Sequence, residues 1–170
     1  LTSMNIAGTW IRDITQVFNQ GNAVVTVVSG GLITHNIHPV SGTKERGLDM
    51  VLGGLVVQSG GNIDVSGRGY RGGRDGHGGD NGLGPGGGGI DSGGGHGATG
   101  GGPAGGVQYG SVSQPVELGS GGGHQPGYGV TGGRGGGAIK ITTSGDIEVA
   151  GSILANGSAG VGTYYSGGAG

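Results

Sequence analysis

The sequence predicts an all-β protein, a parallel β-solenoid (β-helix) that carries an inserted, glycine-rich bundle of polyglycine helices of the polyproline II type. Three observations support this fold class. Stretches on both sides of the middle of the chain alternate apolar and polar residues with the period of two that a β-strand requires. No window shows sustained helical periodicity. Of the 170 residues, 52 are Gly, whereas ordinary usage is about 7%.

These features divide the chain into three predicted zones. Residues 1–66 are rich in Val, Ile and Thr and are expected to form an N-terminal cap and the first solenoid coils. Residues 67–137 hold most of the glycines and form the glycine-rich insert. Residues 138–170 are expected to form a further coil and a Gly/Ser-rich end. The alternative is a β-sandwich with a disordered insert.

A repeat supports the solenoid. Residues 55–67 align without a gap onto residues 139–151, and a weaker copy begins at Val25, with Val25, Val27 and Ile33 matching Leu55, Val57 and Ile63. A two-strand unit of this size cannot bury its apolar face alone, whereas stacked copies bury a continuous one. The residues expected to point inward together are Leu55, Val57, Ile63, Val65, Ile139, Ile141, Ile147 and Val149.

Further strands are expected at residues 50–52 and within residues 152–157. Residues 4–11 and 14–18 are expected to be strands that cap the first coil, since an open end of a solenoid is an unpaired sheet edge. Trp10 and Phe18 are the only large aromatic residues besides Tyr.

The glycine-rich insert is not collagen, because its Gly runs occupy all three phases of a three-residue repeat. Polyglycine helices have three residues per turn and no internal hydrogen bonds, so every N–H and C=O points to a neighbour. Without Cβ atoms such helices also approach closely enough for Cα–H···O contacts. The sequence therefore predicts a packed bundle, with turns at Pro85, Pro103, Pro115 and Pro126.

Several titratable residues of the insert are candidates for a metal site. His77, His96 and His124 have Asp75, Asp80 and Asp91 nearby in the sequence, and such groups can bind a divalent ion. Their spacing enforces no ligand set, so no metal residue is assigned and the metal question stays open.

The remaining motifs do not predict catalysis or cofactor binding. Arg68, Arg71 and Arg74 imitate an RNA-binding segment, but they are expected to bond backbone carbonyls or to reach Asp75 and Asp80. No Gly-rich loop carries the Lys-Ser/Thr of a P-loop, and no Ser lies in a Gly-x-Ser-x-Gly elbow. We predict no enzyme, no catalytic residue and no cofactor.

A family resemblance rests on five motifs. These are Ile63-Asp-Val-Ser-Gly-Arg-Gly-Tyr-Arg-Gly-Gly73, Tyr109-Gly-Ser111, Pro115-Val-Glu-Leu-Gly-Ser-Gly-Gly-Gly123, Gly135-Gly-Gly-Ala-Ile-Lys-Ile141 and Gly151-Ser-Ile-Leu-Ala-Asn-Gly157. In this order they resemble the glycine-rich, β-helical, adhesin-like proteins of bacterial surfaces, over about residues 50–170. The resemblance implies an extracellular, multi-repeat, non-enzymatic protein. A looser similarity is to phage tail-tip adhesins, which also pack polyglycine helices.

These observations predict a structural or adhesive protein of the cell surface, as an adhesin module or a self-assembling filament subunit. Its expected partner is another copy joined head to tail, or the rest of a longer chain. The alternative is a receptor- or glycan-binding phage tip that uses Tyr109, Tyr128, Tyr164 and Tyr165, and ice binding ranks last. A net charge of −2 argues against nucleic acid, and no run of about 18 apolar residues predicts a membrane span.

Overall fold

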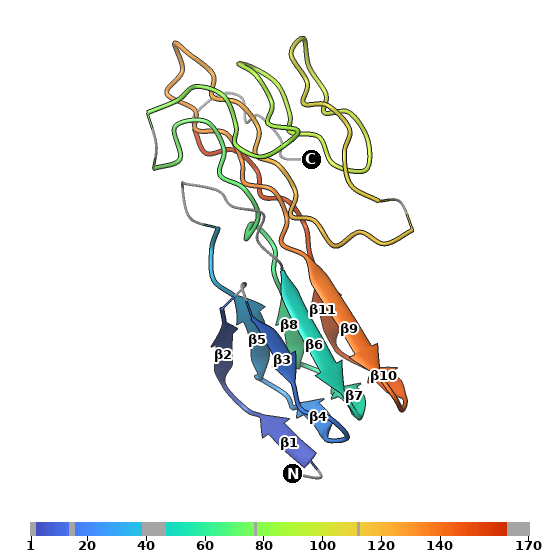
Figure 1. Cartoon of the computed structure of the whole chain (residues 1–170). Helices are drawn as coiled ribbons and strands as arrows, with labels where there is room; N and C mark the ends of the chain where they lie inside the picture. Colours follow the sequence, from blue (N-terminus) through green and yellow to red (C-terminus); the bar gives the residue numbers. More distant parts are fainter. Residues whose placement is uncertain (1–2, 14–15, 39–46, 77, 112, 163–170) are drawn as a thin grey trace. The chain divides into compact units, whose positions relative to one another are not determined.

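A computed structural model describes residues 3–13, 16–38, 47–76, 78–111 and 113–162 (Figure 1). Within these ranges the chain is all-β, with parallel sheets and no helix, and so it contains no helix that could cross a membrane. The strands are β1 (Ser3–Ile6), β2 (Thr9–Arg12), β3 (Val17–Asn19), β4 (Val24–Val27), β5 (Leu32–His35), β6 (Leu48–Leu52), β7 (Gly54–Val57), β8 (Asn62–Asp64), β9 (Ile139–Thr143), β10 (Ile147–Val149) and β11 (Ser152–Leu154).

Each strand pairs with the strand three places later in the chain. One sheet has the order β1-β4-β7-β10, the second β2-β5-β8-β11 and the third β3-β6-β9, and all of these pairs are parallel. Successive strands therefore visit the three sheets in a fixed rotation. The strands predicted at residues 50–52 and within residues 152–157 are confirmed as β6 and β11.

The register of the first copy is confirmed. Val25 of β4 pairs with Leu55 of β7, and Ile33 of β5 pairs with Ile63 of β8. All four side chains are fully buried. Matching apolar positions are thus neighbours in adjacent strands. This register is required because a shift of one residue would turn the apolar side chains of a strand to its other face.

The predicted equivalence of residues 55–67 and 139–151 is wrong by one strand. Ile139 pairs with Leu48 of β6, whereas Leu55 pairs with Ile147 of β10. The alignment matched the alternation of apolar residues, which neighbouring strands share, and alternation alone does not distinguish one sheet from the next. Of the two segments, only residues 55–57 and 147–149 pair with each other, whereas β8 pairs with β11 and β9 pairs with β6.

Glycine precedes the strands of one sheet. Gly31, Gly61 and Gly151 each precede a strand of the β2-β5-β8-β11 sheet, and the carbonyls of Gly31 and Gly61 accept hydrogen bonds from Asn62 and Ser152 in the next layer. A Cβ on Gly61 would lie 2.5 Å from the carbonyl oxygen of Val27, so the corner before β8 closes only without a side chain.

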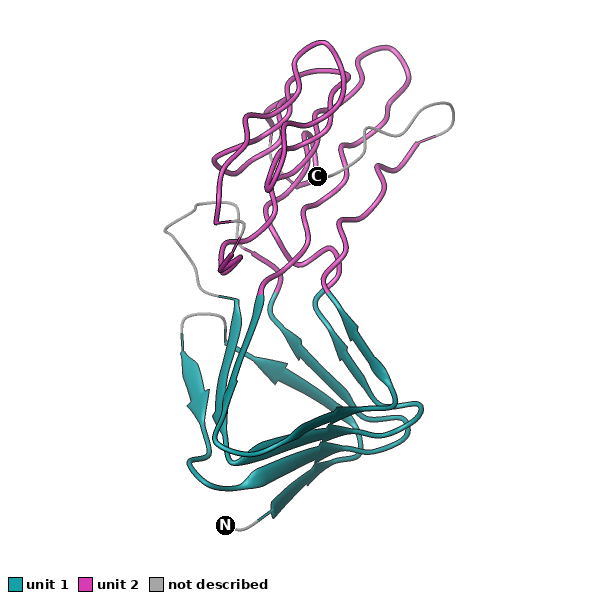
Figure 2. Cartoon of the chain, turned by 90° about the vertical axis from the view of Figure 1, so that its right-hand side faces the viewer, with its two compact units in different colours: residues 1–36, 46–65, 139–154 teal, residues 37–45, 66–138, 155–170 magenta. Residues whose placement is uncertain are grey.

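The chain forms two compact units, coloured in Figure 2. Unit 1 comprises residues 1–36, 46–65 and 139–154 and contains the strands; unit 2 comprises residues 37–45, 66–138 and 155–170. All three segments of unit 2 follow a strand of the same sheet, namely β5, β8 and β11. Unit 1 is held by a side-chain core of buried residues: Ile6, Phe18, Val25, Val27, Ile33, Leu48, Met50, Leu52, Leu55, Val57, Ile63 and Val65.

The predicted bundle of polyglycine helices is not seen in unit 2. Its described residues run as segments without regular secondary structure, separated by turns and bends. Turns are present at Pro85, Pro103 and Pro126, as predicted, but Pro115 is not in a turn. Hydrogen bonds between segments are present, as we expected from backbone groups that have no partner within their own segment.

Residues 118–124 are the buried centre of unit 2. Their backbone hydrogen bonds to one neighbouring segment are three residues apart. The N–H groups of Tyr70 and Gly73 donate to the carbonyls of Gly119 and Gly122, at 3.0 and 2.8 Å. The same two glycines donate to Gly136 and Gly133. One short segment thus joins neighbours from distant parts of the sequence by backbone hydrogen bonds.

Candidate functional site

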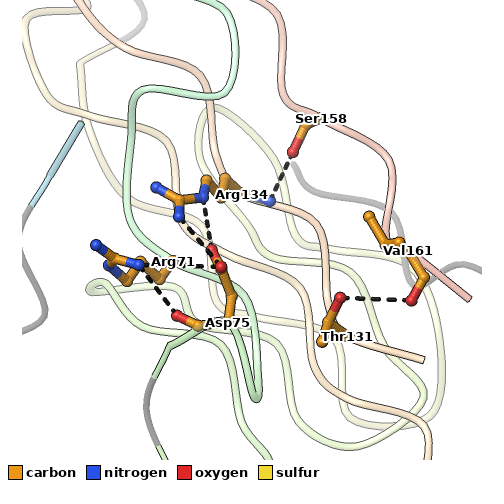
Figure 3. Close-up of polar contacts among 6 residues, drawn as sticks. All are labelled: Arg71, Asp75, Thr131, Arg134, Ser158 and Val161. Atoms are coloured by element: carbon orange, nitrogen blue, oxygen red, sulfur yellow. Dashed lines mark hydrogen bonds and ion pairs between the residues drawn. The ribbon is translucent and has the colours of Figure 1, made fainter. Parts of the chain in front are cut away.

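An arginine clamp joins distant segments of unit 2. Arg134 Nη2 donates to Asp75 Oδ1 at 3.1 Å, and its Nε lies 2.5 Å from Oδ2, so that two guanidinium nitrogens face the two carboxylate oxygens (Figure 3). Arg71 Nη1 lies 3.9 Å from the same carboxylate and donates to the Asp75 carbonyl at 3.3 Å. The predicted contact of Arg71 with Asp75 is confirmed. Two cations around one mostly buried carboxylate fix the turn that carries it.

The second predicted pair is also present. Arg74 Nε donates to Asp80 Oδ1 at 2.5 Å, at the surface. This hydrogen bond, opposed by partial desolvation and aided by the charges of Arg74 and His124, lowers the pKa of the Asp80 carboxyl below its ordinary value. Because the site is exposed, the pair adds little to stability. For Arg68 the structure shows a backbone contact, since its carbonyl accepts from the His38 N–H at 3.3 Å.

The predicted histidine and aspartate residues do not assemble into a metal centre in the part of the chain that the structure describes. There, no three His, Asp or Glu side chains come together. His124 is instead held by its backbone: its N–H donates to the Asp80 carbonyl and its carbonyl accepts from the Asp91 N–H. Its ring Nδ1 contacts the Val130 carbonyl. His77 lies outside the described residues.

A buried hydroxyl pair, which the sequence did not reveal, lies elsewhere in unit 2. Ser120 Oγ accepts from the Gly86 N–H at 3.0 Å and donates to the Tyr109 hydroxyl at 2.9 Å, and that hydroxyl donates to the Leu118 carbonyl. Burial raises the pKa of Tyr109 to about 12, against the effect of the Ser120 bond. Neither partner of Ser120 accepts a proton at neutral pH, so this serine is not activated as a nucleophile.

The bond between Ser120 and Tyr109 bears on the predicted recognition surface of four tyrosines, because Tyr109 is one of them. Tyr109 is tied into unit 2 by its hydroxyl and packs edge-on against His96, with ring centroids 4.9 Å apart. Tyr128, in the turn after Pro126, is 51% exposed. Tyr164 and Tyr165 lie outside the described residues. Among the described members of the set, Tyr128 is more exposed than Tyr109.

An apolar surface is present at the last layer of unit 1, which we define as β9, β10 and β11. Ile147 and Val149 are 50% and 47% exposed, although their register partners Leu55 and Val57 are fully buried. Ile153 is 37% exposed over a fully buried Ile63. The expectation that Ile147 and Val149 are buried is therefore wrong. They are in register with the buried Leu55 and Val57, but among the described residues no further strand pairs with β10 to cover them.

Comparison with protein-family models, with curated proteins and with solved structures finds no match to this chain. The last layer of unit 1 and the polar contacts of unit 2 are therefore interpreted from their own chemistry. The polar contacts hold segments together, whereas the last layer leaves apolar side chains and sheet edges in solvent. We take the last layer as the candidate functional site.

Proposed function

We propose that the chain is a structural or adhesive module of an extracellular surface protein, built as a β-solenoid and able to associate through the end of its sheets. The observation that carries this proposal is that apolar residues occupy the same register position in successive strands of a sheet. Val25, Leu55 and Ile147 occupy one column, and Ile33, Ile63 and Ile153 occupy another. Stacking of this kind extends a structure by repetition, and its ends are the places where another chain can add.

The construction of unit 2 also supports a mechanical role. Its centre is bonded to segments on several sides through backbone N–H and C=O groups. A load applied to one segment is then shared among bonds that must break together. The clamp of Arg71, Asp75 and Arg134 adds a link between residues far apart in the sequence.

Single-molecule pulling tests the proposal. The chain has no Cys, so cysteine handles added at both termini attach it specifically. We expect discrete force peaks from both units, and we expect the variant Gly123→Val to lose the peak of unit 2 while keeping that of unit 1. A chain that extends without force peaks would contradict a structural role.

A further inference from the structure

The two ends of the sheets in unit 1 differ in chemistry. We define the first layer as β1, β2 and β3, which are the terminal strands of the three sheets at one end, as β9, β10 and β11 are at the other. Among the described residues, no strand pairs with the outer edges of either layer. The two layers differ in what covers the core between those edges.

Aromatic rings and a cation cover the core at the first layer. Trp10 and Phe18 pack edge to face with centroids 4.4 Å apart, and Phe18 is buried although it lies on a terminal strand. Trp10 and Arg12 lie two residues apart on β2 and so share one face of the strand. The Arg12 guanidinium carbon lies 4.9 Å from the Trp10 ring centroid and 5.2 Å from that of Phe18. This end carries its own cover.

No comparable cover is present at the last layer within the described residues. Its inward positions hold Ile147, Val149 and Ile153, which are the same size as the residues they stack on, and these side chains are one-third to one-half exposed. Aliphatic groups left in water are unfavourable in proportion to their exposed area. A partner that covers this layer recovers that free energy.

We propose that the last layer binds the last layer of a second copy of this chain, in a two-fold, tail-to-tail dimer. A head-to-tail contact would instead set the Arg12 guanidinium, which lies over the Trp10 and Phe18 rings, against the inward aliphatic groups of the last layer, and burying a charge against apolar groups is strongly unfavourable. The two-fold contact sets matching aliphatic groups against one another, and it is isologous, so it closes.

The edges of the last layer suit this arrangement. A two-fold axis across the stacking direction reverses the direction of the second copy's strands, so edge pairing between β9, β10 and β11 of the two copies is antiparallel. The exposed charges of the layer are of both signs, with Lys140 on β9 and Glu148 on β10. Two copies therefore meet without a uniform repulsion, and the contact is expected to withstand high salt because its core is apolar.

This inference rests on the proposed structural role and sharpens its partner to one surface. It also replaces the head-to-tail polymer expected from the sequence with a closed dimer. The two proposals fail separately: a monomer that resists force overturns association through the sheet ends but leaves the structural role standing, and a dimer that extends without force peaks overturns the structural role alone.

Sedimentation equilibrium of the whole chain over a wide concentration range tests the dimer. We expect the mass to approach twice that of the monomer and to stop there, at low and high salt. Ile147→Asp should raise the dissociation constant at least tenfold. Ile11→Asp is the matched control, because Ile11 is 54% exposed on the first layer and carries the same chemistry; it should leave the dimer unchanged.

Several results would overturn the proposal. A wild-type monomer at every concentration, a mass that keeps growing, or an equal effect of Ile11→Asp each contradicts a tail-to-tail contact. Circular dichroism checks that Ile147→Asp is folded. If it is not, Val149→Thr removes apolar character with little change in shape and should weaken the dimer in the same direction; a dimer unaffected by Val149→Thr would count against the proposal.

Discussion

The two units of this chain reach order by different means. In unit 1, fully buried side chains such as Val25, Ile33 and Leu55 stack between parallel sheets, and the backbone bonds follow the strands. In unit 2, residues 118–124 are equally buried, but four of the seven are Gly, at positions 119 and 121–123. There the backbone itself is the core. Burial therefore does not require side chains when most backbone N–H and C=O groups find partners, as they do in this segment.

Magnitudes show how demanding this second solution is. Fixing a residue costs roughly 1–2 kcal/mol of backbone entropy, and more for Gly. A hydrogen bond contributes about 0.5–1.5 kcal/mol net. A glycine segment therefore needs nearly all of its backbone groups bonded, and it gains further from close contacts that a Cβ would prevent. Unit 2 should be intolerant of added atoms, whereas unit 1 should be intolerant of removed ones.

Adding a side chain at the centre of unit 2 should have the largest effect. A Cβ on Gly123 would overlap the carbonyl of Gly89, so Gly123→Val should cost more than about 4 kcal/mol, the range reached only by specific disruptions of packing. Hydrogen exchange checks this: amides of residues 118–124 should lose protection while those of β4 and β7 keep it. Equal loss in β4 and β7 would mean that the two units unfold as one.

Removing atoms from unit 1 should have the next largest effect. Leu55→Ala should cost about 2–5 kcal/mol, because the side chain is fully buried between β4 and β10. Ile147→Ala is the matched control in the same column, and it should cost less than about 1 kcal/mol since half of that side chain is exposed. Denaturant melts of the monomeric protein give both values. Equal costs would show that the last layer is as well covered as the interior.

Neighbouring glycines offer a finer test of unit 2. A Cβ on Gly100 would overlap the carbonyl of Gly93, whereas a Cβ on Gly101 meets nothing within 4 Å. Gly100→Ala should therefore lower the free energy of unfolding by about 1–3 kcal/mol, as overpacking does. Gly101→Ala should change it little or raise it by up to about 1 kcal/mol, because Ala has fewer unfolded conformations to lose. The contrast fails if both substitutions have the same sign and size.

The sequence allowed part of this comparison to be predicted. The alternation of apolar and polar residues predicted the strands, because it identifies which positions of each strand face inward. Aligning those positions between copies predicted the pairing of Val25 with Leu55 and of Ile33 with Ile63. The alternation did not separate β9 from β7, since all strands share that pattern. The exposure of Ile147 depends on where the stack ends, which alternation does not encode.

The contacts of unit 2 were harder to predict for a different reason. Arg71 with Asp75 and Arg74 with Asp80 are local, and the sequence predicted them. Arg134 reaches Asp75 across the glycine-rich insert, and no periodic pattern of side chains specifies which glycine segments are neighbours. The pair of Tyr109 and Ser120 depends on the same unspecified packing.

That hydroxyl pair gives the smallest expected effect, and it tests whether side chains matter in unit 2 at all. Burial raises the pKa of Tyr109 to about 12, while an unfolded Tyr titrates near 10. Below about pH 10 both states are protonated and the contribution is fully present. As pH rises from about 10 to about 12 the unfolded state loses its proton first, so stability falls.

Tyr109→Phe should remove this dependence and cost about 1 kcal/mol at neutral pH, because it deletes the bonds to Leu118 and Ser120. Unfolding titrations of both proteins between pH 8 and about 12 measure the difference. Tyr128→Phe is the control, since Tyr128 is largely exposed. If wild type and Tyr109→Phe lose stability in parallel above pH 10, the hydroxyl pair adds nothing, and the backbone network alone orders this part of unit 2.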